Sequence, residues 1–230
     1  MHPWQKRRYV RSIILLGVLL CALLYLWLTK PAQRKQFHTK SVPVENAFVK
    51  TTWAVETLLD SQYIPALFEK IESSKRSIDI SMYVIRSDAA SITVNKIIEL
   101  IGEAIKRGVK VRVLLDRPDD INLPHFGFNL NAGAKLALKG ADVRFDDPGI
   151  ELHEKLVIFD RKDFIIGAHN WTEDALIKNR EISVLCQPSQ PIGETESSFE
   201  ERWKRSTPIS KTFGPGEIVN YGDELEGEGQ

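Results

Sequence analysis

Cysteine is scarce in this chain of 230 residues, and no Cys-x-x-Cys pair is present. Cys21 lies in a long apolar run near the N-terminus, and Cys186 lies in a later apolar run. A zinc site built on paired cysteines is therefore not indicated. A bridge between a membrane-embedded Cys21 and a folded domain is not expected either, so the two thiols leave the redox compartment open.

A surplus of charge is also missing, because 31 Lys and Arg balance 31 Asp and Glu. The balance is uneven along the chain: residues 1–40 hold eight basic residues and no acid, which leaves 23 basic and 31 acidic residues in 41–230. Five of these acids lie in the Gly-rich terminus 216–230, which we expect to be a disordered tail. The body of the protein lacks the strongly basic footprint typical of nucleic-acid-binding domains.

Charge is absent from the 18 residues between Ser12 and Thr29, most of which are Leu, Ile or Val. As a helix this segment would be roughly 27 Å long, close to the bilayer core of about 30 Å. A cleaved signal peptide is the alternative, but the apolar run exceeds the usual roughly 7–15 residues and no small-x-small cleavage site follows. We predict an uncleaved single-pass membrane anchor. Its orientation stays open, because four basic residues lie on each side.

The length suffices for one hydrophobic core with appendages. We therefore expect a basic N-terminus (1–11), a transmembrane anchor (12–29), a juxtamembrane linker (30–50), one folded domain (51–215) and an acidic disordered tail (216–230).

Within the folded domain, helical and strand patterns alternate. Apolar residues recur at helical spacing in 64–75, 92–108 and 131–140. A short apolar run typical of a buried strand follows each of them, in 77–85, 109–116 and 141–147. These units predict an α/β fold, a layered α-β-α sandwich with a mixed, largely parallel sheet, preceded by the N-terminal transmembrane helix.

Two further apolar runs, 152–160 and 163–170, flank a charged turn and predict a β-hairpin. Because side chains alternate along a strand, His153 and Lys155 should project from one face, while Leu156 and Ile158 face a core.

Simple hairpin register places Asn170 at the same end as His153. A following strand, 180–186, begins beside Glu181 and brings a carboxylate to that end. We therefore expect His153, Lys155, Asn170 and Glu181 to form one cluster.

This cluster suits a phosphate better than a metal. A lysine two residues from the histidine would repel a divalent cation, whereas lysine and asparagine both donate to an anion. Histidine serves as a nucleophile or proton donor at neutral pH, and Glu181 is suited to holding its tautomer. No metal or other cofactor is expected. Taken singly, each residue has a plainer explanation: His153, His125 and His169 as ordinary polar side chains, and Lys155 as a residue that protects a strand edge.

The spacing resembles the HKD motif of the phospholipase D superfamily: His153-x-Lys155, four residues, Asp160, six residues, and Gly167-Ala-His-Asn170. Glu181 also falls where small single-motif members keep a carboxylate. The motif covers about 152–185, and the looser order of elements extends the resemblance from about Ser61 to Trp203. One departure is Ala168, where the family usually has serine.

The resemblance implies a metal-free phosphodiesterase that works through a phosphohistidine. Because only the His-x-Lys at 153–155 is followed by the rest of the motif, and His38-Thr39-Lys40 is not, it also implies a homodimer in which two copies of His153 act as nucleophile and acid. Lys155 and Asn170 would stabilise the phosphoryl oxygens, and Asp160 would brace the turn.

The substrate is open between two classes. The anchor and the absence of basic surplus favour a phospholipid in a membrane, hydrolysed to phosphatidic acid. A short single-motif chain also resembles endonucleases that cut DNA or RNA. Because Ala168 removes a hydroxyl donor, an inactive membrane-bound binding protein is the third possibility.

Overall fold

The computed structural model describes residues 53–120, 122–189 and 191–211. The predicted anchor, linker and acidic tail lie outside these residues. Among the helices that are described, none is long and apolar enough to cross a bilayer.

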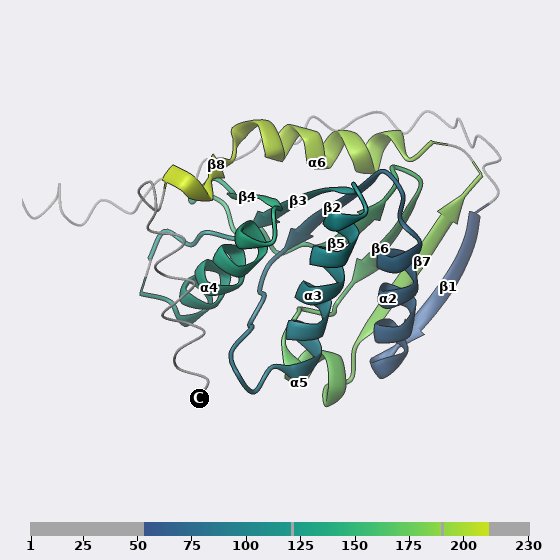
Figure 1. Ribbon diagram of the computed structural model, residues 1–230, viewed down its shortest axis with the longest axis horizontal. Coiled ribbons are helices and arrows are strands. Elements are labelled where there is room, and N and C mark those ends of the chain that lie inside the picture. Colours follow the sequence, from purple (N-terminus) through teal and green to yellow (C-terminus); the bar gives the residue numbers. More distant parts are fainter. Residues whose placement is uncertain (1–52, 121, 190, 212–230) are drawn as a thin grey trace, which may run out of the picture. The chain divides into compact units, whose positions relative to one another are not determined.

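Eight strands form one sheet in the order β1-β7-β6-β5-β2-β3-β4-β8 (Figure 1). Their bounds are β1 Trp53–Leu59, β2 Ser77–Met82, β3 Lys110–Leu115, β4 Asp142–Phe145, β5 Lys155–Phe159, β6 Asp163–Gly167, β7 Ile182–Pro188 and β8 Thr207–Pro208. The helical elements are η1 Asp60–Gln62, α2 Tyr63–Ser73, α3 Ile92–Lys106, α4 Pro124–Leu138, α5 Glu173–Ile177, α6 Gly193–Arg205 and η2 Ile209–Lys211.

The mixed sheet confirms the α/β class, but the expectation of a largely parallel sheet is wrong. Only β2–β3 and β3–β4 pair in parallel, and the five other neighbouring pairs are antiparallel. The helix–strand units seen in the sequence account for the parallel part, because a helical crossover returns the chain to the same end of the sheet. The β5–β6 hairpin and the strands beside it reverse direction, and they make up the larger part.

Helices cover both faces of the sheet. On one face, α2, α3 and α4 bury side chains such as Leu67, Ile97 and Leu136 against Val113 and Val157. On the other face, α6 is the one helix among the described residues that packs on the sheet.

A second hydrophobic cluster lies between α6 and the sheet. Phe199 and Trp203 of α6 pack with Leu156, Ile158 and Phe164 of the hairpin. Leu156 and Ile158 therefore face a core, as predicted.

The two ends of the sheet, at opposite ends of its strands, carry different groups. We call the site end the end at which β2 and β6 finish and β5 and β7 begin. We call the turn end the opposite one, where β2 and β3 begin and the β5–β6 turn lies. Five residues of β5, about 16 Å of strand, separate the two ends.

At the turn end, Asp160 ties the hairpin to the loop between α2 and β2. Its Oδ1 accepts backbone N–H groups from Arg76 at 2.6 Å and Ser77 at 3.0 Å, and its Oδ2 accepts that of Lys75 at 3.0 Å. Partial burial acts to raise the pKa of Asp160, but the backbone donors outweigh it and the pKa lies below its ordinary value. Asp160 also has φ +53°, a left-handed conformation that Asp and Asn tolerate better than other side chains.

We expect Asp160→Ala to lower the free energy of unfolding by about 2–3 kcal/mol at neutral pH, because it removes charge-assisted hydrogen bonds. Asp160→Asn is the matched control, since it keeps an acceptor and tolerates the backbone. A depressed folded pKa stabilises the protein above the ordinary Asp value near 3.9, and this stabilisation is lost as the pH falls through the folded pKa. Urea denaturation between pH 7 and pH 3 should therefore show the difference from wild type shrinking, and a constant difference would contradict the assignment.

Candidate active site

The site end of the sheet gathers four of the five residues that the sequence singled out. His153 precedes β5 and Lys155 begins it, while Asn170 follows β6 by three residues and Glu181 immediately precedes β7. Trp171 donates its N–H to the Val84 carbonyl at 3.0 Å, which holds the segment after β6 against the end of β2. Asp160 is the exception: it lies at the turn end and has the structural contacts described above.

The centre of the site is a lysine held against a histidine. Lys155 Nζ lies 3.1 Å from His153 Nδ1 and 3.2 Å from Nε2, and it donates to the His153 carbonyl at 3.1 Å. The Tyr83 ring completes the group, with its centroid 4.9 Å from Lys155 Nζ and 4.6 Å from the His153 ring. The lysine is buried, whereas the imidazole is exposed.

Burial lowers the pKa of Lys155, and the carboxylates of Glu151 and Glu181 act in the opposite direction. The cation is thus partly removed from water but surrounded by negative and π-electron density. A group of this kind interacts strongly with an incoming anion, because little water screens it.

Behind His153, a buried carboxylate and an amide hold the loops in place. Asp116 directly follows β3, and its Oδ1 accepts the Leu152 N–H at 2.8 Å. Asn129 on α4 donates to the Tyr83 and Asp116 carbonyls at 2.8 and 3.1 Å and accepts the Ile85 N–H at 2.9 Å. These contacts fix both the residue before the histidine and the backbone of Tyr83.

His125 lies on the second oxygen of that carboxylate. Its Nε2 is 3.1 Å from Asp116 Oδ2, and its ring centroid is 5.2 Å from that of Tyr83. Burial raises the pKa of Asp116, and the Leu152 N–H and His125 act to lower it.

Tyr83, Asp116 and Asn129 were not predicted from the sequence. The available signal was a polar residue directly after a buried strand, as in Asp116, but nothing in the pattern joined Asn129 to it. A position on α4 becomes a neighbour of β2 and β3 only after the helix packs on the sheet.

Glu154 links the site to α6. This residue lies between His153 and Lys155, and its carboxylate accepts from Ser81 Oγ at 2.7 Å and from Arg202 Nη2 of α6 at 2.7 Å. Its backbone carbonyl also accepts the Tyr83 N–H at 2.8 Å. The backbone between the two motif residues is therefore clamped from both sides.

Asn170 and Glu181 differ from expectation in their contacts. The Asn170 Oδ1 is buried and has no hydrogen-bond partner among the described residues. Glu181 Oε1 accepts from Asn179 at 3.2 Å, and no hydrogen bond joins Glu181 to His153 within the described part of the chain. Glu181 therefore makes no direct contact through which it could orient the His153 imidazole in this structure.

His169 is a buried structural residue. Its Nε2 donates to the Asp60 carbonyl at 2.9 Å, its Nδ1 pairs with Ser183 Oγ at 2.7 Å, and its ring stacks on Tyr63. Burial lowers the pKa of His169, which favours the neutral ring that these partners require.

Close packing explains why the motif has a glycine at position 167. A Cβ on Gly167 would collide with Ser183 Oγ and Cα and lie 2.6 Å from the Ile182 carbonyl oxygen. Neighbouring Ala168 is exposed, so a serine there would fit without disturbing the core.

No group of three or more His, Cys, Asp or Glu side chains is arranged to hold a metal within the described residues.

A mixed sheet between helices, with a His-x-Lys pair at one end of its central hairpin, defines a domain of the phospholipase D type. Residues 67–203 match the family described as "Cardiolipin synthase, PLD-like domain", and the chain belongs to that family. The resemblance drawn from the motif is thereby confirmed.

Two relatives are mitochondrial cardiolipin hydrolases. The chain is 27% identical to that of Homo sapiens over 150 residues, covering 65% of this chain and 54% of the relative. It is 31% identical to that of Canis lupus familiaris over 110 residues, covering 48% and 41%. The chain thus spans about half the length of these relatives.

Two solved structures share the fold. Nuc from Salmonella typhimurium, a phospholipase D family member, superimposes with a TM-score of 0.57 at 23% identity, covering 68% of this chain and 98% of that one. NucT from Helicobacter pylori gives a TM-score of 0.55 at 16% identity, covering 68% and 99%. At these identities the likeness concerns the fold alone.

The clamp on Glu154 yields a test. If His153 is the nucleophile, as the motif predicts, we expect Arg202→Met and Glu154→Gln each to lower the kcat for a phosphodiester about tenfold, because small displacements of a reacting group are costly. Arg205→Met on the same helix is the matched control and should retain activity. Steady-state kinetics on a chromogenic phosphodiester measures the effect, and unchanged kcat in both clamp variants would show that the clamp does not position His153.

Proposed function

We propose that this chain is a phosphodiester hydrolase in which His153 is the nucleophile. The observation that carries the proposal is the exposed His153 imidazole in contact with the buried Lys155 ammonium, 3.1 Å away. An imidazole nitrogen attacks phosphorus, the bond to the leaving oxygen breaks, and that oxygen takes a proton from an acid. Water then cleaves the phosphohistidine, which releases a phosphomonoester and restores His153.

Lys155 and Asn170 are placed to stabilise charge on the phosphoryl oxygens. The Lys155 ammonium is held by the His153 carbonyl and the Tyr83 ring, so it needs little reorganisation when an anion arrives. The Asn170 amide can donate its N–H groups to a phosphoryl oxygen, whereas its buried Oδ1, which has no partner among the described residues, is an acceptor and would not bind the anion. Asp160 is assigned a structural role.

We assign the acid to His153 of a second copy, because the chain contains one complete motif of this kind. An exposed apolar sheet face supports a homodimer. Val55 and Leu59 of β1, Ile166 of β6 and Ile182 of β7 are 55, 46, 40 and 60% exposed. Register places Val55 opposite Cys186 and Ile166 opposite Leu156, both of which contribute to the α6 core. This face therefore continues the α6 side of the sheet as far as the site end, and pairing two copies would bury it.

A phospholipid is the lead substrate. The supports are the family description, the names of the relatives and the apolar segment 12–29, which would place the enzyme on a membrane. Cleavage of the diester on the headgroup side yields phosphatidic acid. Endonuclease action is the second candidate, favoured by the fold shared with Nuc from Salmonella typhimurium.

The nucleophile assignment predicts that His153→Ala abolishes turnover while the dimer persists. Lys155→Met should lower the rate about 10²–10³-fold, because it keeps volume but removes charge stabilisation. The matched control is Lys178→Met, which changes an exposed lysine directly after α5. Light scattering during size-exclusion chromatography measures the dimer. Mixed wild-type and His153→Ala dimers should trap phosphohistidine without efficient turnover, and a fully active monomer would rule out the shared site.

The substrate class is decided by offering the full chain diacyl phospholipid vesicles, single-stranded DNA and RNA, each with and without EDTA. We expect phosphatidic acid to appear and EDTA to have no effect, because the proposed chemistry uses histidine and lysine alone. Cleavage of oligonucleotides with steep salt dependence and no phosphatidic acid would replace the lipid with a nucleic acid. Activity that is lost in EDTA and restored by a divalent ion would contradict the metal-free phosphohistidine mechanism.

A further inference from the structure

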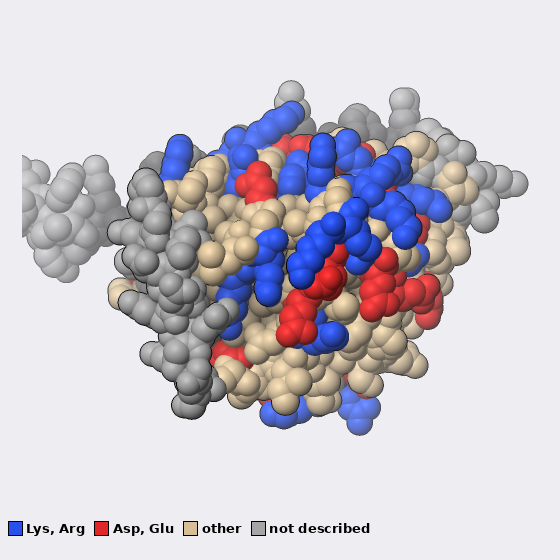
Figure 2. Space-filling view, viewed as in Figure 1, with Lys and Arg blue, Asp and Glu red and all other residues tan. Residues whose placement is uncertain are grey.

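The turn end of the sheet, remote from His153, carries a concentration of positive charge. Eight exposed cations lie on the loops and helix ends that meet there: Lys75, Arg76, Lys106, Arg107, Lys110, Lys139, Arg161 and Lys162. We call these residues the turn-end cluster. Figure 2 shows Lys and Arg side chains gathered in the upper part of the view, where α2 and α3 end, and few charges lower down.

Six of the eight cations have no ion pair within the described residues. Lys75, Lys110, Lys139 and Lys162 have neither an ion pair nor a side-chain hydrogen bond there. Arg76 and Arg107 donate to the carbonyls of Asp160 and Ile71, and each also interacts electrostatically with a carboxylate, Arg76 with that of Asp160 and Arg107 with that of Glu103.

The remaining two cations do have acidic partners. Lys106 pairs with Glu103 at 2.9 Å, and Arg161 pairs with Glu196 at 3.1 Å. Two exposed acids, Glu72 and Asp142, are close in sequence to the cluster. Positive charge still predominates at this end.

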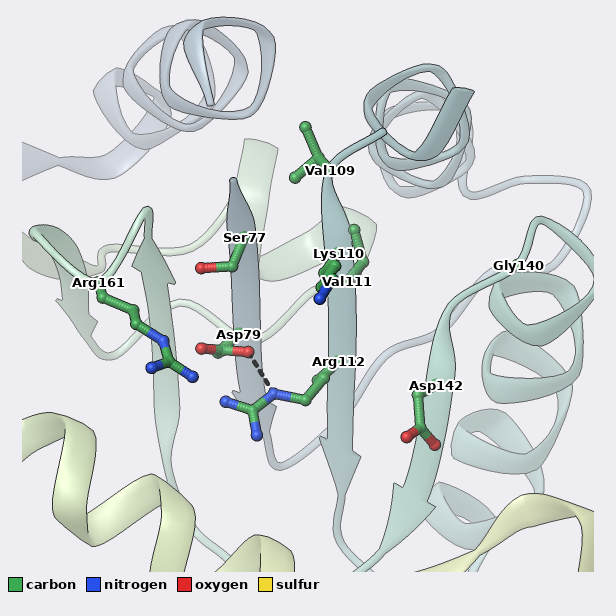
Figure 3. A pocket seen from close by; sticks show the side chains of 9 residues that line it. All are labelled: Ser77, Asp79, Val109, Lys110, Val111, Arg112, Gly140, Asp142 and Arg161. Carbon is green, nitrogen blue, oxygen red and sulfur yellow. Dashed lines mark hydrogen bonds and ion pairs between the residues drawn. The ribbon is translucent and has the colours of Figure 1, made fainter. Parts of the chain in front are cut away.

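A cavity of about 500 Å³ opens inside the cluster, between Lys110 and Arg161 (Figure 3). Its inner cation, Arg112, turns toward Asp79 and bonds it at 2.6 Å, and it also bonds Glu200 at 2.7 Å. Because the inner charge is neutralised, the cavity is a poor receptor for a small anion. The lysines around the mouth of the cavity have no ion pairs and are spread over a broad surface.

The chain also enters the domain at this end. β1 is antiparallel to β7, with Trp53 opposite Pro188 at the turn end and Leu59 opposite Ile182 at the site end. Residues 30–52 separate Trp53 from the uncharged segment 12–29. If the segment 12–29 lies in a bilayer, as the sequence predicts, 23 residues join it to Trp53, a length whose reach as a random coil is roughly 25–30 Å.

We infer that the turn-end cluster is a docking surface for an anionic lipid bilayer, and that docking directs the site end away from it. Lysines on four separate loops suit headgroups spread over a plane, and each basic residue near such a surface strengthens binding roughly fivefold. A nucleic-acid substrate fits less well, because a strand bound here would be separated from His153 by the length of β5, about 16 Å. The inference does not depend on which diester the site cleaves.

Docking has a consequence for substrate access. With the turn end on the bilayer, His153 opens toward the aqueous side, so a docked domain receives its diester from solution or from a facing surface. A lipid in the host bilayer would be reached only after the domain undocks.

The test uses the full chain with a fluorescent non-natural residue at one of two exposed positions, Ser73 near the turn end or Ile177 on α5 at the site end. Energy transfer to an acceptor on lipid headgroups is measured in vesicles with and without about 30% phosphatidylserine. We expect anionic lipid to raise transfer from Ser73 more than from Ile177, and 0.5 M salt to reverse the rise. The probes report docking whether the chain is inserted in the vesicle or added from outside.

Two charge-matched variants complete the test. Lys110→Gln with Lys162→Gln should weaken docking about 10–30-fold, whereas Lys96→Gln with Lys178→Gln, away from the cluster, should leave it within twofold. Equal transfer from both probes, or equal effects of both double variants, would overturn the proposal. Loss of oligonucleotide binding in the first variant with unchanged transfer would assign the surface to nucleic acid instead.

Discussion

The buried ammonium of Lys155 is the constraint on which the active site depends. Removing a cation from water costs free energy unless other groups replace the lost hydration. Here the His153 carbonyl, the face of Tyr83 and the field of Glu151 and Glu181 replace it. Each of these groups must therefore be held in place, and the surrounding hydrogen bonds do that. Glu154 is clamped by Ser81 and by Arg202 of α6.

The two ends of the sheet carry different sets of side chains. Its site end holds a preorganised pocket of polar groups around one cation, and its turn end holds a broad surface of exposed cations. Asp160 belongs to the motif in sequence but to the turn end in space, where backbone N–H groups of the α2–β2 loop surround its carboxylate. The hairpin is thus fixed at one end by a carboxylate, and at the other it presents the histidine.

Much of the fold was predictable because its elements have strong local patterns. The helices α2 and α3 and the strands β2, β3, β5 and β6 lie where apolar periodicity placed them. The dominance of antiparallel pairing was not predictable in the same way. β1 pairs with β7, more than 120 residues later, and no local pattern encodes that partner.

The sequence by itself determined the family and the identity of the motif residues, because His153, Lys155 and Asn170 stand at a spacing that a hairpin converts into proximity. The tertiary structure alone decided what surrounds them. Tyr83 and Asp116 follow β2 and β3, whereas Asn129 and Arg202 lie on α4 and α6 and reach the site only when these helices pack on opposite faces of the sheet. Asp160 lies at the turn of the hairpin, as the sequence predicted, whereas only the structure shows that Glu181 bonds Asn179 and not His153, because packing between strands, and not distance in sequence, governs which side chains meet.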